Sequence, residues 1–257
     1  MIPKIIHYCW FGHGEMSPLM KKCIKSWKKY CPDYQIIEWN EDNFDINSCV
    51  WTKEAYESKK WAFVTDYVRL KVLSKYGGVY MDTDVEVIKP IDKFLIHSGF
   101  SGFENCNRVP TGIIAAEKGN KVINLWLSYY DGLQYLVDGE PCMKPNVDFM
   151  TDMLLQNGLV LNNEYQEIVD MALYPQTYFC PINVDKLEKH ITNDTYTIHH
   201  FTSTWRKPSE LKNFKKVKRH QTKWYRALEY LRYVPNRIAR KIFSDKLIDK
   251  LKKRVGK

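Results

Sequence analysis

The most constraining feature of this 257-residue sequence is one continuous block, residues 60–84, with the sequence KWAFVTDYVRLKVLSKYGGVYMDTD. The segment from Lys60 to Tyr76 is the clearest helical segment of the chain. Gly77 stands where a helix commonly ends in a left-handed residue, and Gly78 permits a tight entry into the apolar run 79–81. The block therefore predicts a helix that turns at once into a buried strand, with two aspartates directly after it.

Short apolar and aromatic runs alternate with helical segments elsewhere, beginning with a strand over 5–11, a helix over 17–30 and a strand over 34–39. This alternating order predicts an α/β fold with a mostly parallel, mixed sheet flanked by helices. Further strands are expected over 85–88, 99–104, 111–116 and 196–201, and further helices over 121–130 and 149–156.

The motif Asp82-Thr83-Asp84 places two carboxylates, one residue apart, at the carboxyl end of the expected strand. In α/β proteins this end of a parallel strand borders the crevice where ligands bind. Carboxylate oxygens suit Mg²⁺ or Mn²⁺, and such an ion can neutralise charge that builds up on a departing nucleoside diphosphate. The motif alone also fits a solvated turn, so the surrounding sequence must show which of the two it is.

Charge is unevenly distributed along the chain, which carries +9 overall. Residues 205–257 contain 19 Lys or Arg against 4 Asp or Glu, giving +15, whereas residues 1–204 contain 20 against 26, giving −6. An acidic body is unlike the basic surface of a nucleic-acid-binding domain, so no nucleic-acid partner is expected. We expect a catalytic domain over residues 1–205 and a basic helical C-terminal appendage over residues 206–257.

The end of this appendage has the pattern of a basic amphipathic helix. Apolar residues recur mainly four apart from Ile238 to Val255, and lysines and arginines surround them. Such a helix lies on an anionic membrane surface, or it packs on the body with its basic face in solvent, and the sequence leaves both open. Membrane docking would bring the protein close to any ligand carried on a membrane lipid.

The cysteines and the N-terminus bear on the cellular compartment. The seven cysteines include no Cys-x-x-Cys pair, so zinc-ligand and redox spacings are absent and a disulfide framework is not expected. The N-terminal segment lacks the apolar run of a signal peptide, and no stretch reaches the ~18 apolar residues that a membrane span needs. These features predict a cytoplasmic protein, with the appendage able to hold it peripherally on the inner face of the plasma membrane.

Three segments, in order, resemble the DXD-containing sugar transferases of glycosyltransferase family 32. They are the block 61–84, the opening PKIIHYCW at 3–10 and HFTSTW at 200–205. The resemblance extends over residues 1–205 and implies a GT-A-type nucleotide-sugar-binding fold. It further implies retaining transfer of a hexose or N-acetylhexosamine from a nucleotide-sugar, expected to be a UDP-sugar, to a glycan acceptor. We expect this reaction in bacterial capsule, exopolysaccharide or lipopolysaccharide assembly.

The resemblance also implies a metal site and a sugar site. Asp84 would bind the metal directly and Asp82 through water or through the donor. His199 and His200 lie in an expected strand and face opposite ways, and the match gives the metal to His200, which favours Mn²⁺ over Mg²⁺. Asp66 and Arg69, three residues apart on one helix face, would otherwise form an ordinary surface ion pair. In the family these two positions contact the donor's sugar and phosphate.

The remaining donor contacts that the resemblance implies are Trp10, Tyr80, Ser203 and Trp205. Trp10 matches a position that packs near the nucleotide base, although a core tryptophan fits nearly as well. Ser203 and Trp205 match residues that reach the diphosphate from a closing loop. No protein base is named, because the leaving phosphate is expected to take the proton of the acceptor hydroxyl.

Two other functions compete with glycosyl transfer. A phosphohydrolase of the haloacid dehalogenase class would use Asp82 as nucleophile and Asp84 as acid and base, but the later aspartate pair of that class is missing. A non-catalytic protein that binds membrane or nucleic acid through its basic tail gives no reason for the arrangement of Asp66, Arg69, Asp82 and Asp84. Glycosyl transfer is therefore the preferred interpretation.

Overall fold

A computed structural model describes residues 1–105, 108–110, 112–142, 146–183 and 188–202. The described residues of 1–183 and 189–202 form one compact unit. The predicted appendage, residues 206–257, lies outside the described residues, so its boundary and its helical character stay predictions. None of the helices in the described parts of the chain is long and apolar enough to span a bilayer.

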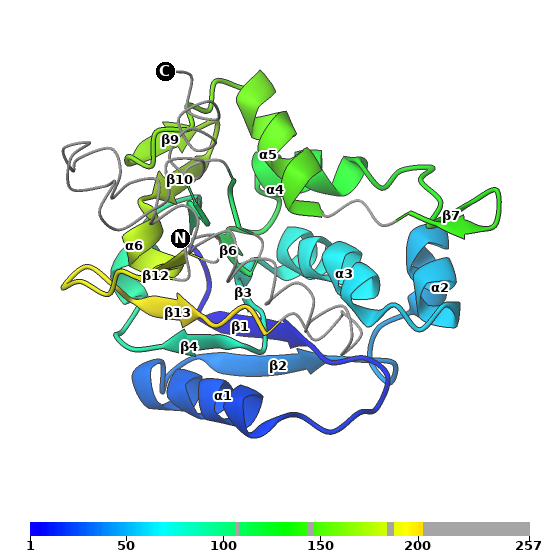
Figure 1. Cartoon of the computed structure of the whole chain (residues 1–257), viewed down its shortest axis with the longest axis horizontal. Helices are drawn as coiled ribbons and strands as arrows, with labels where there is room; N and C mark the ends of the chain where they lie inside the picture. Colours follow the sequence, from blue (N-terminus) through cyan, green and yellow to red (C-terminus); the bar gives the residue numbers. More distant parts are fainter. Residues whose placement is uncertain (106–107, 111, 143–145, 184–187, 203–257) are drawn as a thin grey trace, which may run out of the picture. The chain divides into compact units, whose positions relative to one another are not determined.

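Helices and strands are interspersed along the described chain (Figure 1). The helices are α1 (Pro18–Tyr30), α2 (Val50–Glu57), α3 (Trp61–Tyr76), α4 (Lys121–Ser128), α5 (Asn146–Gln156) and α6 (Gln176–Phe179), with 3₁₀ turns η1 (Ile46–Ser48) and η2 (Asp92–Phe94). The strands are β1 (Ile5–Cys9), β2 (Gln35–Trp39), β3 (Gly78–Met81), β4 (Val85–Val87), β5 (Gly99–Gly102), β6 (Ile113–Ala116), β7 (Leu136–Val137), β8 (Glu140–Pro141), β9 (Gln166–Ile168), β10 (Met171–Tyr174), β11 (Ile182–Asn183), β12 (Glu188–Lys189) and β13 (Thr197–His199).

Seven strands form the central sheet of the described chain, in the order β2-β1-β3-β6-β5-β10-β9. Strands β2, β1 and β3 are parallel to one another, and β5 is parallel to β10. Strand β6 is antiparallel to both of its neighbours, and β9 is antiparallel to β10. Five of these seven described strands thus run the same way, which confirms the predicted α/β fold with a mostly parallel, mixed sheet.

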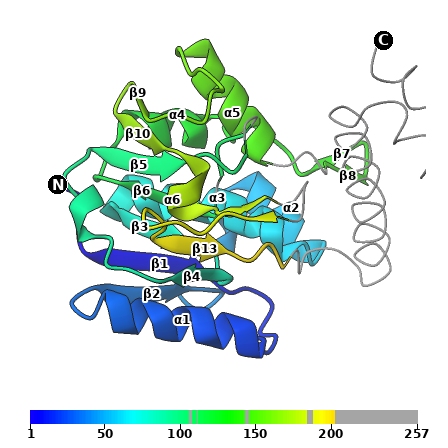
Figure 2. The same ribbon diagram turned by 60° about the vertical axis from the view of Figure 1, so that its left-hand side comes forward.

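Apolar side chains project from both faces of the central sheet, and a separate hydrophobic core forms against each face. Tyr80 and Ile114 point into the core that α2, α3, α4 and α5 cover. Val79, Met81 and Ile113 point into the opposite core, which α1, β4 and α6 cover (Figure 2). This alternation follows from the two-residue period of a strand that is buried on both faces.

Two glycines allow α3 to run directly into β3. Gly77 has φ 69° and Gly78 has φ 109°, both in the region that favours glycine. A Cβ atom on Gly77 would lie 2.7 Å from the backbone nitrogen of Lys118, and one on Gly78 would lie 2.7 Å from the carbonyl oxygen of Ile5. The turn that the sequence predicts is therefore enforced both by backbone conformation and by close contact with neighbouring strands.

Strand β4 leaves the central sheet directly after the DXD motif and pairs with β13 instead. The two strands are antiparallel, with Ile198 opposite Glu86 and His199 opposite Val85. Helix α1 covers β4, and the indole nitrogen of Trp27 donates a hydrogen bond of 2.7 Å to the Val85 carbonyl. The late strand, which the sequence predicts without a location, is thereby placed beside Asp84.

Candidate active site

Helix α3 contributes a buried ion pair to the end of β3. Asp66 and Arg69 are 8% and 4% exposed, and Arg69 Nη2 lies 3.0 Å from Asp66 Oδ1. Arg69 Nη1 lies 3.5 Å from Asp82 Oδ1, and the guanidinium carbon lies 4.7 Å from the centre of the Tyr80 ring. One arginine thus joins two carboxylates and an aromatic ring. The spacing alone predicts a solvent-exposed ion pair, whereas this pair is buried. Each charge has lost most of its water and depends on its partner to compensate that loss.

The last residues of β3 orient Asp82. The Tyr80 hydroxyl donates a hydrogen bond of 2.9 Å to Asp82 Oδ1, and the Asp82 amide donates one of 2.8 Å to the Gly112 carbonyl. The Asp82 side chain stays 27% exposed. Its Oδ1 atom therefore faces Tyr80 and Arg69, while Oδ2 remains for a ligand.

Asp84 is held by residues that follow β13. The backbone amide and the hydroxyl of Thr202 both donate to Asp84 Oδ2, at 2.7 and 2.8 Å. The His200 amide donates to the Asp84 carbonyl at 3.0 Å, and His199 Nε2 lies 3.2 Å from Asp84 Oδ1. Burial opposes ionisation of Asp84, but His199 and Thr202 together lower the pKa of this carboxyl well below its usual range. Asp84 is therefore ionised at any physiological pH.

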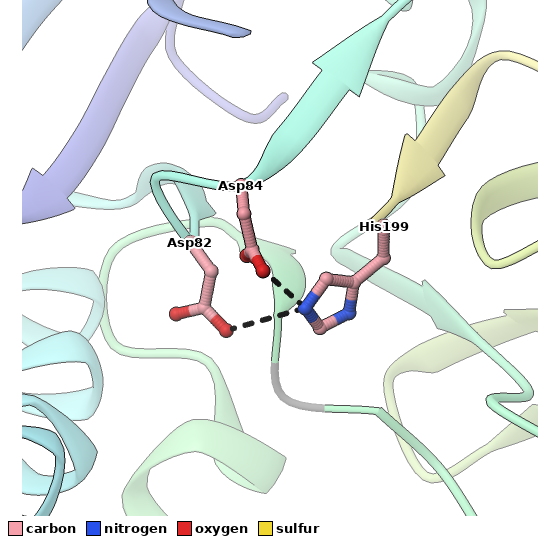
Figure 3. A group of neighbouring side chains, drawn as sticks. All are labelled: Asp82, Asp84 and His199. Atoms are coloured by element: carbon pink, nitrogen blue, oxygen red, sulfur yellow. Dashed lines mark ion pairs between the residues drawn. The ribbon is translucent and has the colours of Figure 1, made fainter. Parts of the chain in front are cut away.

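Asp82, Asp84 and His199 form the group in the described chain that could hold a metal ion (Figure 3). One ligand atom from each lies within 4.8 Å of the others, and His199 Nε2 is 4.0 Å from Asp82 Oδ2. Two carboxylates and one imidazole are a donor set that Mn²⁺ accepts readily, so the residues present fit the ion that the sequence predicts. Burial opposes protonation of His199, but Asp84 raises its pKa well above the usual value, so protons compete with a metal for this nitrogen.

The histidine beside the two aspartates is His199, whereas the sequence gives this role to His200. His200 Nε2 lies 2.9 Å from Glu86 Oε2, and Glu86 Oε1 lies 2.7 Å from Lys22. The cause is the register of the β4–β13 pair. Ile198 stands opposite Glu86, and side chains two residues apart in a strand share a face, which directs His200 towards Glu86. We therefore transfer the proposed ligand role from His200 to His199.

Gly112 and Cys180, which the sequence does not single out, lie next to the His199 ring. A Cβ atom on Gly112 would lie 2.6 Å from His199 Cε1 and 3.0 Å from Asp82 Oδ2, so only glycine fits between these side chains. The buried thiol of Cys180 interacts with His199, and the Nδ1 atom of this ring is buried without a hydrogen-bond partner among the described residues. A ring proton on Nδ1 would leave Nε2 free to bind a metal.

Asn146 and Glu104 extend the site beyond the predicted residues. Asn146 begins the described part of α5, and its side-chain amide donates a hydrogen bond of 2.7 Å to Asp66 Oδ1. Burial raises the pKa of Asp66 to about 7, and Arg69 opposes that rise. Glu104 follows β5, and burial raises its pKa, while its charge interacts with that of His199. Neither residue belongs to a motif; order along the chain alone suggests the segment that begins at Asn146 as a place for acceptor contacts, and nothing in the single sequence marks Glu104.

Of the other predicted donor contacts, Trp10 lies within the described residues and Ser203 and Trp205 do not. Trp10 follows β1, packs partly buried against the core on the α1 side, and donates through its indole nitrogen to the Gly14 carbonyl at 2.6 Å. No hydrogen bond joins Trp10 to Asp82 or Asp84 among the described contacts, so its role stays a prediction. Ser203 and Trp205 lie outside the described residues.

The described chain is thus an α/β protein with a DXD motif at the end of a central strand. The family described as "glycosyltransferase sugar-binding region containing DXD motif" matches residues 17–101. This match confirms the predicted resemblance to the DXD-containing sugar transferases. The match includes α3, β3 and β4, which carry Asp66, Arg69, Asp82 and Asp84.

Similar proteins are also glycosyltransferases by name. Inositol phosphoceramide mannosyltransferase 3 of Schizosaccharomyces pombe is 28% identical over 123 residues, which are 46% of this chain and 34% of that protein. The uncharacterized glycosyltransferase L373 of Acanthamoeba polyphaga mimivirus is 24% identical over 214 residues, 80% of this chain and 84% of that protein. The solved PaToxG glycosyltransferase superposes with a TM-score of 0.45 at 21% identity, covering 60% of this chain and 69% of that chain. The chain spans about a third of the length of the fungal relative.

Proposed function

We propose that this protein is a metal-dependent, retaining glycosyltransferase that moves a hexose or N-acetylhexosamine from a nucleotide-sugar to a glycan acceptor. The observation that carries the proposal is the convergence of Asp82, Asp84 and His199 next to the buried Asp66–Arg69 pair. A metal site for a diphosphate and a polar site for a sugar are the two parts that a nucleotide-sugar needs. Arg69 connects them, because it contacts both Asp66 and Asp82.

Asp84, Asp82 and His199 would hold the divalent ion. The imidazole ligand favours Mn²⁺ over Mg²⁺, which prefers an all-oxygen shell. When bound, the ion supplies positive charge that stabilises the departing nucleoside diphosphate. Thr202 occupies Asp84 Oδ2, so Oδ1 is the oxygen that Asp84 offers.

Asp66, Arg69 and Asn146 would bind the sugar. Asp66 Oδ1 already accepts from Arg69 and Asn146, so its other oxygen is the one directed at sugar hydroxyls. Arg69 keeps its positive charge at every physiological pH and can neutralise a phosphate oxygen. Catalysis would rest on positioning and charge stabilisation, and the acceptor proton would pass to the leaving phosphate.

The proposal also includes a donor, an acceptor and a biological setting. A UDP-sugar donor, a lipid-linked acceptor, and bacterial capsule, exopolysaccharide or lipopolysaccharide assembly at the inner face of the plasma membrane remain our expectation. The fungal relative is, by its name, an inositol phosphoceramide mannosyltransferase. Its name supports a hexose donor and a lipid acceptor for this chain more directly than it supports a bacterial polysaccharide.

Donor turnover without acceptor tests the proposal. The full-length protein is incubated with a panel of UDP- and GDP-sugars and Mn²⁺, and the released nucleoside diphosphate and free sugar are quantified. We expect one donor to be hydrolysed slowly, with loss of activity in excess chelator and a loss of about 100-fold or more in Asp84→Asn. Glu15→Gln, which changes an exposed carboxylate outside these contacts, is the matched control. Full turnover in chelator, or in Asp84→Asn, would overturn the proposal.

A further inference from the structure

Helix α1 carries an exposed row of lysines that the proposed site does not use. Its thirteen residues, PLMKKCIKSWKKY, contain five lysines and no acidic residue. All five lysine side chains are exposed, whereas Met20, Cys23, Ser26 and Trp27 of the same helix are buried. The exposed lysines are Lys21, Lys22, Lys25, Lys28 and Lys29.

Helical geometry gathers these lysines on one face. At about 100° per residue, Lys21, Lys25 and Lys28 form one longitudinal row, and the five together occupy an arc of about 120°. The buried residues lie on the opposite side, where Trp27 bonds to Val85 and Ser26 accepts a hydrogen bond of 2.9 Å from the Val87 amide. These two contacts with β4 fix the rotation of α1, so the lysine row cannot turn inward. We call this row the α1 lysine face.

The α1 lysine face is electrostatically unfavourable for the isolated helix. Lys21 and Lys25, like Lys25 and Lys29, are like charges four residues apart, which repel on a helix surface. Lys21 also stands in the first turn, where the helix dipole disfavours cations. Lys22 pairs with Glu86, but Lys21, Lys25 and Lys28 form no ion pair with any residue of the described chain. An external anionic partner would remove this repulsion.

The composition of the body makes the face more distinctive. Residues 1–204 carry a net charge of −6, and a quarter of their 20 basic residues stand on this single helix. A body of net negative charge with one concentrated basic face orients that face towards a negative surface. The concentration of positive charge is therefore a property of helix α1 rather than of the whole unit.

We propose that the α1 lysine face docks this protein on an anionic membrane surface. The row from Lys21 to Lys29 is about 12 Å long, follows a convex helix, and consists of lysine without arginine. Lysine acts as a point charge and does not impose the paired geometry with which arginine recognises a single phosphate. A row of point charges on a convex surface matches a plane of mobile anionic headgroups better than it matches one bound molecule.

The face also lies close to the proposed active site. Lys22 contacts Glu86 at 2.7 Å, Glu86 contacts His200 at 2.9 Å, and the His200 amide bonds to the Asp84 carbonyl. Docking through α1 would therefore bring the site near lipids of the same membrane. The docking itself does not depend on the proposed function, because it rests on charge and exposure alone.

Vesicle binding with a charge-matched control tests this inference. Full-length protein is sedimented with vesicles of phosphatidylcholine containing 30% phosphatidylglycerol, and with pure phosphatidylcholine, at low and high salt. The test variant is the triple Lys21→Gln, Lys25→Gln, Lys28→Gln. The control is the triple Lys53→Gln, Lys71→Gln, Lys118→Gln, which removes three exposed lysines, and the same net charge, from other parts of the chain.

We expect wild-type protein to bind the anionic vesicles and not the neutral ones. Because each lysine near an anionic surface contributes roughly fivefold in affinity, the α1 triple should lose about 100-fold at low salt and less at high salt. The control triple should lose only a few fold. Circular dichroism and donor hydrolysis should be unchanged in both.

Three results would overturn the inference. Equal losses in the two triples would show that only net charge matters. Absence of wild-type binding to anionic vesicles would show that the face is simply solvated. Preferential binding of heparin or single-stranded DNA over the vesicles, lost in the α1 triple, would assign the face to a soluble polyanion instead.

Discussion

Thr202 donates two hydrogen bonds to one carboxylate oxygen of Asp84, through its amide and through its hydroxyl, at 2.7 and 2.8 Å. These bonds join the end of β13 to the start of β4 across more than a hundred residues of sequence. They leave Asp84 Oδ1 as the oxygen that faces His199, so the position of a bound ion should depend on Thr202.

Thr202→Val is expected to weaken metal binding while leaving the fold intact. Valine keeps the shape and the amide bond but removes the hydroxyl that holds Asp84 Oδ2. Loss of a residue that orients a metal ligand typically costs 10–100-fold in affinity, so we expect a decrease of about tenfold in Mn²⁺ affinity. Electron paramagnetic resonance of free Mn²⁺ measures this directly. Thr202→Ser, which retains the hydroxyl, should bind like wild type; equal weakening in both variants would contradict the explanation.

Gly112→Ala should separate His199 from Asp82. The new methyl group would stand 2.6 Å from His199 Cε1 and 3.0 Å from Asp82 Oδ2, and Gly112 has no positive φ, so the effect is steric only. We expect Mn²⁺ affinity to fall by about 100-fold, as when supporting residues of a metal site are lost. Gly14→Ala is the matched control, because a Cβ atom there meets nothing within 4 Å. Unchanged Mn²⁺ affinity in Gly112→Ala would show that the three side chains do not act together.

Asp66→Ala should impair use of the donor sugar more than binding of the free nucleoside diphosphate. Asp66 contacts Arg69 and Asn146 and lies on the side of Arg69 away from the metal ligands. We expect turnover to fall by about 100-fold while the dissociation constant of the diphosphate, measured by calorimetry, changes only a few fold. The exposed Asp152→Ala on α5 is the control. Equal losses for donor and free diphosphate would show that Asp66 acts by supporting Arg69.

His7 should make folding stability depend on pH below neutrality. Its ring is fully buried between β1 and the glycine turn, with Nε2 donating to the Gly77 carbonyl at 2.8 Å and Nδ1 accepting from the Trp39 indole at 3.0 Å. Burial lowers the pKa of His7, against the effect of the Gly77 carbonyl. The neutral ring therefore contributes stability that is fully present above the unfolded pKa of about 6.5 and is lost as pH falls towards the lowered folded pKa.

Urea unfolding between pH 5 and 8 measures this contribution. The wild-type free energy of unfolding should decrease below about pH 6.5, and His7→Gln should show a smaller decrease over the same range. Other histidines, including His199 with its raised pKa, contribute to both proteins alike, so the difference between the two curves isolates His7. His13→Gln, at an exposed position, is the control. Parallel curves for wild type and His7→Gln would contradict the prediction.

Local sequence determined the part of the protein that ends in the DXD motif. Helix α3, the glycine turn and β3 follow from helical periodicity, from the conformational freedom of Gly77 and Gly78, and from a short apolar run. These are interactions within about 25 residues, so they are visible in one sequence. The family resemblance added roles for Asp66, Arg69, Asp82 and Asp84, and the structure places all four together.

Only tertiary structure decided which residues complete the site. The choice of His199 over His200 depends on the register of β13 against β4, and a shift of one residue exchanges the two side chains. Helix α2 and strands β9 and β10, which the sequence does not predict, form around long-range contacts that no local pattern announces. Asn146, Gly112, Cys180 and Thr202 reach Asp66, Asp82, His199 and Asp84 across long stretches of chain. Their role arises from proximity in space, which periodicity and motif spacing do not encode.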